Sequence, residues 1–246
     1  MVGKLKADKP DSDKQKKDSG GRRRKRVDFE VEIKLPFDDV APLLDSGLAV
    51  EVVTPRRFED NWVYKLPDGK LRKGQYLRVR YVGDGNGSGR RHEGILTYKG
   101  KARRESAASK RDNKGKKVRE EIETSVGQPS KVAKIIKRLG LTRSFRYQRF
   151  RTVYTIAVED GQTLLAMFDE TPIGNFLELE GEAALIETVA SALGFPSSAF
   201  IAESYVEIQI KRCAARGEGL KDMVFRRMKK SRKPAEIPEE AAAAAS

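Results

Sequence analysis

Residues 27–36 read Val-Asp-Phe-Glu-Val-Glu-Ile-Lys-Leu-Pro, a strict alternation of apolar and charged side chains. Successive side chains of a β-strand point to opposite faces, so this stretch predicts a strand with two unlike faces. The apolar face carries Val27, Phe29, Val31, Ile33 and Leu35, and the charged face carries Asp28, Glu30, Glu32 and Lys34. A half-exposed strand of any globular protein has the same pattern. The charged face is therefore either a solvated surface or part of a site.

The same alternation recurs along the chain, with charged residues at every second position. The charged faces carry Arg78 and Arg80, Lys99, Arg119 with Glu121 and Glu123, Arg149 with Arg151, Glu178 with Glu180, and Glu207 with Lys211. Charge repeated in this way on so many strands indicates a common lining. If these faces turn inward in a closed barrel, their charges must be paired or must hold a ligand, because an uncompensated buried charge is prohibitively unfavourable.

Strand patterns outnumber helical ones, so we expect a β-dominated α+β fold. Strands are predicted at 27–35, 50–54, 62–66, 75–83, 93–100, 117–126, 145–158, 162–169, 175–181 and 204–212. Helices are predicted at 38–46, 129–139 and 181–193. The polar stretches 83–94 and 101–116 have the spacing of hairpin loops between antiparallel strands.

The chain has 246 residues and 38% hydrophobic residues, which fits one main domain with polar extensions. We place the domain at 27–212, a basic N-terminal tail at 1–26 and a charged C-terminal tail at 213–246. The formal net charge is +14, of which the first 26 residues carry +7 and the last 26 carry +3. Most of the excess thus lies in segments whose composition is typical of disorder, where weak contacts with nucleic acid or polyphosphate are the expected use.

A single cysteine, Cys213, excludes an internal disulfide and a zinc site built from several thiolates. The sequence has no run of about 18 apolar residues, and its first residues lack the apolar stretch of a secretory signal. These observations predict a cytoplasmic protein without a membrane partner.

The two kinds of charge in the predicted lining suit two parts of one ligand. Clustered glutamates suit Mg²⁺ or Mn²⁺, which prefer oxygen ligands and bridge to phosphate oxygens. Rows of arginine and lysine suit the remaining phosphate charge, because guanidinium groups can bind phosphate in a bidentate manner. A polyphosphate chain held between cations and metal ions explains both sets of residues.

The segment Glu30-Val31-Glu32-Ile33-Lys34 resembles the Glu-x-Glu-x-Lys signature of the CYTH family, the triphosphate tunnel metalloenzymes. The segments that follow resemble the family in the same order: Leu77-Arg78-Val79-Arg80, Leu96-Thr97-Tyr98-Lys99-Gly100, Arg119-Glu120-Glu121-Ile122-Glu123, Arg149-Phe150-Arg151, Asp169-Glu170, Asn175-Phe176-Leu177-Glu178-Leu179-Glu180 and Ser204-Tyr205. The resemblance covers residues 27–212. It implies an eight-stranded antiparallel closed β-barrel with a few surface helices, which holds a triphosphate and Mg²⁺ or Mn²⁺. The family's dimers also leave a homodimer open.

The resemblance also implies a role for each matching residue. Metal-binding carboxylates are expected at Glu30, Glu32, Glu121, Glu123, Asp169, Glu178 and Glu180. Phosphate-binding cations are expected at Lys34, Arg78, Arg80, Lys99, Arg119, Arg149 and Arg151, and we add Lys211 from its place in the alternation. Catalysis is expected to involve Glu30, Glu32 and Lys34.

Three functions remain open from the sequence. The first is a metal-dependent hydrolase of tripolyphosphate, thiamine triphosphate or a nucleoside triphosphate. The second is a class IV adenylate cyclase, which would make cyclic AMP and pyrophosphate from ATP. The third is a polyphosphate-binding module without catalysis, which would need the cations but not six placed glutamates. We expect the hydrolase, acting through attack on a metal-bound triphosphate.

Overall fold

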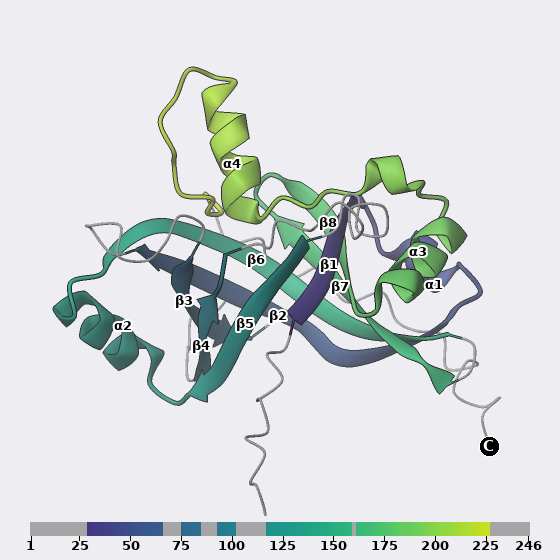
Figure 1. Cartoon of the computed structure of the whole chain (residues 1–246), viewed down its shortest axis with the longest axis horizontal. Helices are drawn as coiled ribbons and strands as arrows, with labels where there is room; N and C mark the ends of the chain where they lie inside the picture. The colour runs from purple at the N-terminus through teal and green to yellow at the C-terminus, as the bar shows by residue number, and fades with distance from the viewer. Residues whose placement is uncertain (1–28, 66–74, 85–92, 102–116, 159–160, 227–246) are drawn as a thin grey trace, which may run out of the picture.

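The protein is an antiparallel β-barrel with helices on its outer surface (Figure 1). The computed structural model describes residues 29–65, 75–84, 93–101, 117–158 and 161–226. Its strands are β1 (Phe29–Pro36), β2 (Ala49–Lys65), β3 (Tyr76–Gly83), β4 (Glu93–Lys99), β5 (Lys117–Val126), β6 (Thr142–Ala157), β7 (Thr163–Thr171) and β8 (Gly174–Glu180). The helices are α1 (Ala41–Leu44), α2 (Pro129–Arg138), α3 (Ala183–Ala192) and α4 (Tyr205–Ala214), with a short 3₁₀ turn η2 (Ser197–Ala199). The predicted β-dominated α+β class is confirmed.

The barrel closes in the order β1-β5-β4-β3-β2-β6-β7-β8, and every pairing is antiparallel. Strand β1 closes it by pairing with β5 through Phe29–Glu32 and with β8 through Glu32–Pro36. Consecutive strands from β2 to β5 form hairpins, as the sequence spacing predicted. Most of the predicted loops 101–116 and 83–94 lies outside the described residues.

Two predicted strands, 50–54 and 62–66, are parts of one long strand, β2. Pro55 lies in the interval between the two predicted strands. Instead, the pairing of β2 with β6 shifts register between Val52 and Thr54 and again between Thr54 and Arg57. Such β-bulges accommodate a proline while the strand continues. The consequence is that Arg57, Glu59 and Asn61 belong to the barrel wall.

The predicted strand 204–212 is wrong, because these residues form the helix α4. Ser204 caps the helix: the backbone N–H of Glu207 donates to Ser204 Oγ, and Glu207 accepts from the backbone N–H of Ser204 at 2.7 Å. This reciprocal capping box outweighs the alternation of apolar and polar residues. The buried residues of α4 are Tyr205, Gln209 and Cys213, which recur every four residues as a helix requires.

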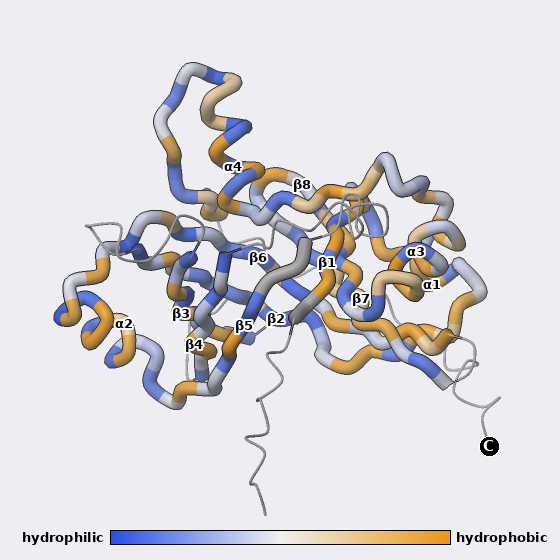
Figure 2. The backbone as a smooth tube through the Cα atoms, viewed as in Figure 1, coloured by the Kyte–Doolittle hydropathy of each residue, from blue (hydrophilic) through white to orange (hydrophobic). Residues whose placement is uncertain are grey.

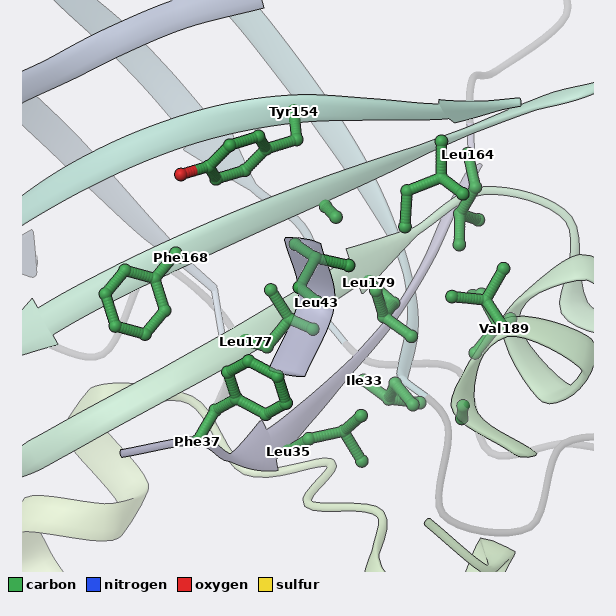
Figure 3. Close-up of a cluster of buried hydrophobic side chains, with 14 residues drawn as sticks. Ile33, Leu35, Phe37, Leu43, Tyr154, Leu164, Phe168, Leu177, Leu179 and Val189 are labelled. Atoms are coloured by element: carbon green, nitrogen blue, oxygen red, sulfur yellow. The ribbon is translucent and has the colours of Figure 1, made fainter. Parts of the chain in front are cut away.

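The apolar core lies outside the barrel, between the strands and the helices. The largest cluster packs α1 and α3 against β1, β6, β7 and β8 (Figure 3). It contains Ile33 and Leu35 of β1 with Leu177 and Leu179 of β8, each fully buried. Another cluster packs α2 against β2 and β3. In the hydropathy view, α1 and α3 lie next to each other on one side of the molecule, and both contain apolar stretches (Figure 2). The apolar faces predicted from the sequence therefore point outward, and the charged faces point into the barrel.

One end of the barrel interior is closed by apolar side chains from α4 and the segment after it. Tyr205 packs against Tyr147 and Phe176, with ring centroids 5.7 and 5.6 Å apart. Met223 joins the same cluster and exchanges backbone hydrogen bonds with β6. Helix α4 thus spans the domain boundary predicted at residue 212, and its packing closes this end of the interior. Within the described ranges, no helix is long and apolar enough to cross a membrane.

Candidate active site

A cavity of about 200 Å³ lies inside the barrel, and its lining is mostly charged. Every strand of the barrel contributes a lining residue. The predicted site residues that line it are Glu32, Lys34, Arg78, Arg80, Lys99, Glu121, Glu123, Arg149, Arg151, Glu178 and Glu180. The structure therefore brings together eleven residues from six strands that the sequence could relate only by their alternation.

Four other predicted residues have different positions. Asp169 is fully buried and does not line the cavity, but it accepts hydrogen bonds from Arg149 and Arg151, which do. Glu30 and Arg119 are register partners where β1 pairs with β5. The structure describes the backbone of both residues but not their side chains. Lys211 does not line the cavity: it lies on α4, pairs with Glu203, and its side chain is 70% exposed. Its expected phosphate contact rested on the wrong strand prediction for 204–212.

Glu178 holds two cations at the centre of the cavity. Its Oε1 lies 3.1 Å from Lys34 Nζ, and its Oε2 accepts from Arg151. Burial by itself would lower the pKa of Lys34, but Glu178 and Glu32 raise it above its ordinary value. Burial by itself would raise the pKa of Glu178, but Arg151 and Lys34 hold it well below its ordinary value. Lys34 and Glu178 are therefore both charged at neutral pH.

A second group of charges joins β3, β4 and β5. Arg78 Nη2 lies 2.9 Å from Glu123 Oε1 and 3.2 Å from Glu121 Oε1, and Lys99 Nζ also pairs with Glu121. Thr97 donates to Glu123 at 2.6 Å. Burial would raise the pKa of Glu123, but Arg80 and Arg78 lower it. Arg78 and Lys99 thus form ion pairs with the carboxylates of strand β5.

Buried acids orient the arginines from behind the cavity surface. Glu59 accepts from Arg149 Nε at 2.8 Å and lies 3.5 Å from Arg80 Nε. Asp169 accepts from Arg149 Nη1 at 2.9 Å and from Tyr205 Oη at 2.6 Å. Burial would raise the pKa of Glu59, but Arg149 and Arg80 hold it well below its ordinary value. Since these acids are fully buried, they fix the arginines and leave guanidinium edges directed into the cavity.

Arginines that line the cavity repel one another, including neighbours on one strand such as Arg78 and Arg80. Burial and the neighbouring Arg78 lower the pKa of Arg80 to about 10, although Glu59 opposes this effect. Two buried donors, Asn61 Nδ2 and Arg78 Nε, have no acceptor in the part of the chain that the structure describes. A cavity with an excess of cations and unsatisfied donors is suited to an anion.

Sequence reasoning missed Arg57, Glu59 and Asn61 on β2 and Tyr147 on β6. The three β2 residues lie in the interval 55–61, which was left out of the predicted strands. Arg57, Glu59 and Asn61 occupy every second position, and this alternation continues into the predicted strand 62–66. The continued alternation was the signal that could have found them. Tyr147 accepts a hydrogen bond from Arg78 Nη1 at 3.1 Å, so it fixes a cation predicted from sequence.

The carboxylates have the chemistry of a Mg²⁺ site that shares its ion with a ligand. Among the described residues, no three His, Cys, Asp or Glu side chains lie close enough together to hold a metal ion unaided. Glu32 and Glu180 are register partners of β1 and β8, and both line the cavity. One or two carboxylates, completed by phosphate oxygens and water, form a common Mg²⁺ environment. The residues present fit such a shared site.

Comparison with known proteins agrees with this architecture. A protein of Pyrococcus horikoshii OT3 called PH1819 aligns with a TM-score of 0.55 and 23% identity, over 74% of this chain and 99% of that one. A proposed adenylate cyclase from Vibrio parahaemolyticus aligns with a TM-score of 0.54 and 18% identity, over 73% of this chain and 97% of that one. At these identities the likeness shows a shared fold. A search of curated proteins found no match.

The model of the CYTH domain matches residues 28–194 of this chain. The matched range includes all eight strands of the barrel, from Phe29 to Glu180, and the charged side chains that line its cavity. The resemblance based on Glu30-Val31-Glu32-Ile33-Lys34 and the motifs that follow it is confirmed: this chain belongs to the CYTH domain family.

Proposed function

We propose that this protein is a divalent-metal-dependent hydrolase of triphosphates, which binds the triphosphate inside the barrel. Membership of the CYTH family supports an enzyme that acts on triphosphates. The observation that carries the proposal is the convergence of seven cations on one cavity: Lys34, Arg57, Arg78, Arg80, Lys99, Arg149 and Arg151. Only a ligand with several negative charges along a short chain would engage cations from so many strands.

Two classes of carboxylate have different roles in this proposal. Glu59 and Asp169 are fully buried and continue to orient Arg149 when a ligand binds. Glu123, whose side chain is 38% exposed, and Glu121 occupy Arg78 and Lys99 in the structure. Phosphate oxygens would take over these cations. The displaced carboxylates would then need a positive partner, because they would otherwise repel the bound anion.

A divalent cation held by Glu32 and Glu180 with the phosphate oxygens would supply Lewis-acid activation of the reacting phosphorus and neutralise developing charge. The protein's own residues provide the rest of the chemistry. Arg149 and Arg151, fixed by Asp169, hold the phosphoryl oxygens and stabilise the charge that grows on them in the transition state. Lys34 is placed to neutralise the leaving phosphate oxygen.

Glu32 is the residue that we assign to the attacking water. Its Oε1 lies 3.8 Å from Lys34 Nζ, and its side chain is 15% exposed, so it borders both the cations and the open part of the cavity. A carboxylate there can accept a hydrogen bond from water and direct its lone pair at phosphorus. Water attack on the terminal phosphate releases orthophosphate and leaves a diphosphate.

The test is phosphorus NMR of the purified protein with tripolyphosphate and, separately, with ATP, each with Mg²⁺ or Mn²⁺. We expect orthophosphate with pyrophosphate or ADP, and we expect Glu32→Gln to abolish their formation. Glu51→Gln, an exposed change on β2, is the matched control and should retain turnover. Pyrophosphate with cyclic AMP would instead assign the protein as a cyclase. Binding of triphosphate without any product would assign it as a binding module.

A further inference from the structure

A second cavity, of about 410 Å³, lies beside α4, where the segment that follows the helix returns to the barrel (Figure 1). Its lining comes from residues 171–173 at the turn between β7 and β8, from α4 with Arg216 just after it, and from residues 222–226. It shares no lining residue with the cavity inside the barrel. The proposed hydrolase therefore gives it no role, and we call it the outer cavity.

Three arginines give the outer cavity an excess of positive charge. They are Arg212 on α4, Arg216 after the end of the helix and Arg226. Within the described ranges, none of the three guanidinium groups forms an ion pair or a hydrogen bond. These groups are therefore available to a negatively charged ligand.

Asp222 is the one acid on the lining that the structure describes, and its carboxylate has partners of its own. Its Oδ1 accepts from the backbone N–H of Arg146 at 2.8 Å, and its Oδ2 lies 3.5 Å from Arg143 Nη2. Arg143 does not line the outer cavity, so Asp222 is paired with a cation outside it. Three arginines against one aspartate leave the described lining with a net charge of +2.

Gln209 adds a hydrogen-bond acceptor that lacks a donor. It is only 8% exposed, and it lines the outer cavity. Its Nε2 donates to the backbone carbonyl of Lys221 at 3.2 Å, which sets the orientation of the amide. Its Oε1 is buried and has no donor among the described residues. Buried polar groups are almost always hydrogen-bonded, so this acceptor indicates a ligand that brings a donor of its own.

We propose that the outer cavity binds orthophosphate. The arginines bind its negatively charged oxygens, because guanidinium groups form strong charge-assisted hydrogen bonds with phosphate. Orthophosphate keeps at least one P–OH group at neutral pH, and this hydroxyl donates to Gln209 Oε1. Sulfate has the same shape but no proton to donate, so it leaves the acceptor unpaired. The inference does not rest on the proposed hydrolase, since binding here needs no turnover in the barrel.

Orthophosphate in the outer cavity joins α4 to the segment that follows it. Met223 of that segment exchanges backbone hydrogen bonds with β6, and Tyr205 of α4 donates to the buried Asp169. These contacts close one end of the barrel. A ligand that binds only the closed arrangement stabilises it by mass action, so phosphate should protect α4 from local opening.

The experiment is a calorimetric titration of the full-length protein with sodium phosphate and, separately, with sodium sulfate, at neutral pH and equal ionic strength. We expect the wild type to bind phosphate about tenfold more tightly than sulfate, because only phosphate satisfies Gln209. Gln209→Met keeps the length of the side chain without the acceptor, and it should abolish this preference. Arg212→Gln should weaken the binding of both anions by about tenfold.

Lys211→Gln is the matched control, because it removes the neighbouring charge on α4, which lies outside both cavities. It should keep the wild-type affinities. Equal affinities for phosphate and sulfate in the wild type would overturn the proposal. A phosphate affinity that neither Gln209→Met nor Arg212→Gln changes would also overturn it, and would place the anion in the barrel. If Gln209→Met did not fold, Arg212→Gln compared with Lys211→Gln would still decide.

Hydrogen exchange locates the bound anion. Phosphate should slow exchange of the amides of α4 and residues 222–226 in the wild type and in Lys211→Gln, but not in Arg212→Gln. Protection confined to the barrel strands would refute the outer site. Absence of triphosphate turnover would leave these titrations unaffected, so the proposed hydrolase and the outer site can fail separately.

Discussion

Glu59 Oε2 accepts the Nε–H of Arg149 at 2.8 Å inside the barrel, where Glu59 is fully buried and Arg149 is 2% exposed. The same carboxylate pairs with Arg57 at 3.0 Å, so one acid positions cations from two strands. Neither residue of β2 was predicted to belong to the site. The pair shows that Arg149, which we propose binds phosphate, is held by a buried acid that does not line the cavity.

Glu59→Gln should therefore destabilise the protein as well as impair its binding of triphosphate. Removing one partner of a buried ion pair leaves an uncompensated charge, and such changes typically lower the free energy of unfolding by ~3–5 kcal/mol. Urea denaturation measures the loss, with the exposed Glu51→Gln on the same strand as control. A Glu59→Gln protein as stable as the control would show that Arg149 does not need this partner.

Acid should weaken the fold through the carboxylates whose pKa is lowered. Burial would raise the pKa of Glu178, yet Arg151 and Lys34 hold it well below its ordinary value, and the pKa of Glu59 is likewise lowered. Their stabilisation is thus complete above the unfolded pKa of about 4.3 and is lost as pH falls through the folded pKa.

Glu178→Gln should accordingly be less stable than the wild type at neutral pH, and its free energy of unfolding should fall less steeply in acid. Urea titrations between neutral pH and about pH 3 measure both slopes. If the free energy of unfolding fell equally steeply with pH in both proteins, Glu178 would not have the lowered pKa that the prediction requires.

Glu121→Gln should bind triphosphate more tightly than the wild type when no metal is present. Glu121 pairs with Lys99 and Arg78, so it competes with phosphate for both cations. Relief of that competition should raise the metal-free affinity for tripolyphosphate on the order of tenfold, or ~1.4 kcal/mol. Calorimetry with a chelator and then with Mg²⁺ measures it. Glu120→Gln, a change at the neighbouring position of β5 outside the cavity, is the control. A weaker metal-free affinity in Glu121→Gln would refute the competition.

Tyrosine ionisation should report on the closed end of the barrel. Burial and the nearby Asp169 raise the pKa of Tyr205 well above its ordinary value, burial raises that of Tyr64 to about 12, and burial also raises that of Tyr154. Because the pKa values of these tyrosines are raised in the folded state, the contribution of the tyrosines to stability is fully present below their unfolded pKa of about 10. It is lost as pH rises through the folded pKa values. In an ultraviolet titration, these three tyrosines should ionise at a higher pH than a free tyrosine.

Tyr205→Phe should remove one late-ionising group and weaken the attachment of α4. Its hydroxyl donates to Asp169 at 2.6 Å, and hydrogen bonds to charged groups typically contribute about 1.5–3 kcal/mol. Hydrogen exchange of the α4 amides should become faster than in the wild type. Unchanged exchange and an unchanged titration would show that the hydroxyl has no such role.

The alternation of side chains predicted most of the barrel, because a period of two is a property of the strand itself. It placed both Glu32 and Lys34 on the face that lines the cavity. It failed for Lys211, where a capping box at Ser204 creates a helix that alternation cannot reveal. It also failed at Glu59, because the bulges that carry β2 past Pro55 depend on pairing with β6. Which acid meets which cation depends on register, and no single strand contains that information.

The apolar core lies outside the barrel and the charged side chains lie inside it. Neighbouring residues of one strand therefore have different roles. Ile33 packs under the helices, whereas Lys34 faces the cavity. Tolerance to substitution should therefore oscillate along each strand: a library scored for soluble protein would be sensitive at positions such as 33, 35, 177 and 179, and the same library scored for turnover would add positions such as 32 and 180. Stability and catalysis can then be engineered on alternate residues of the same strand.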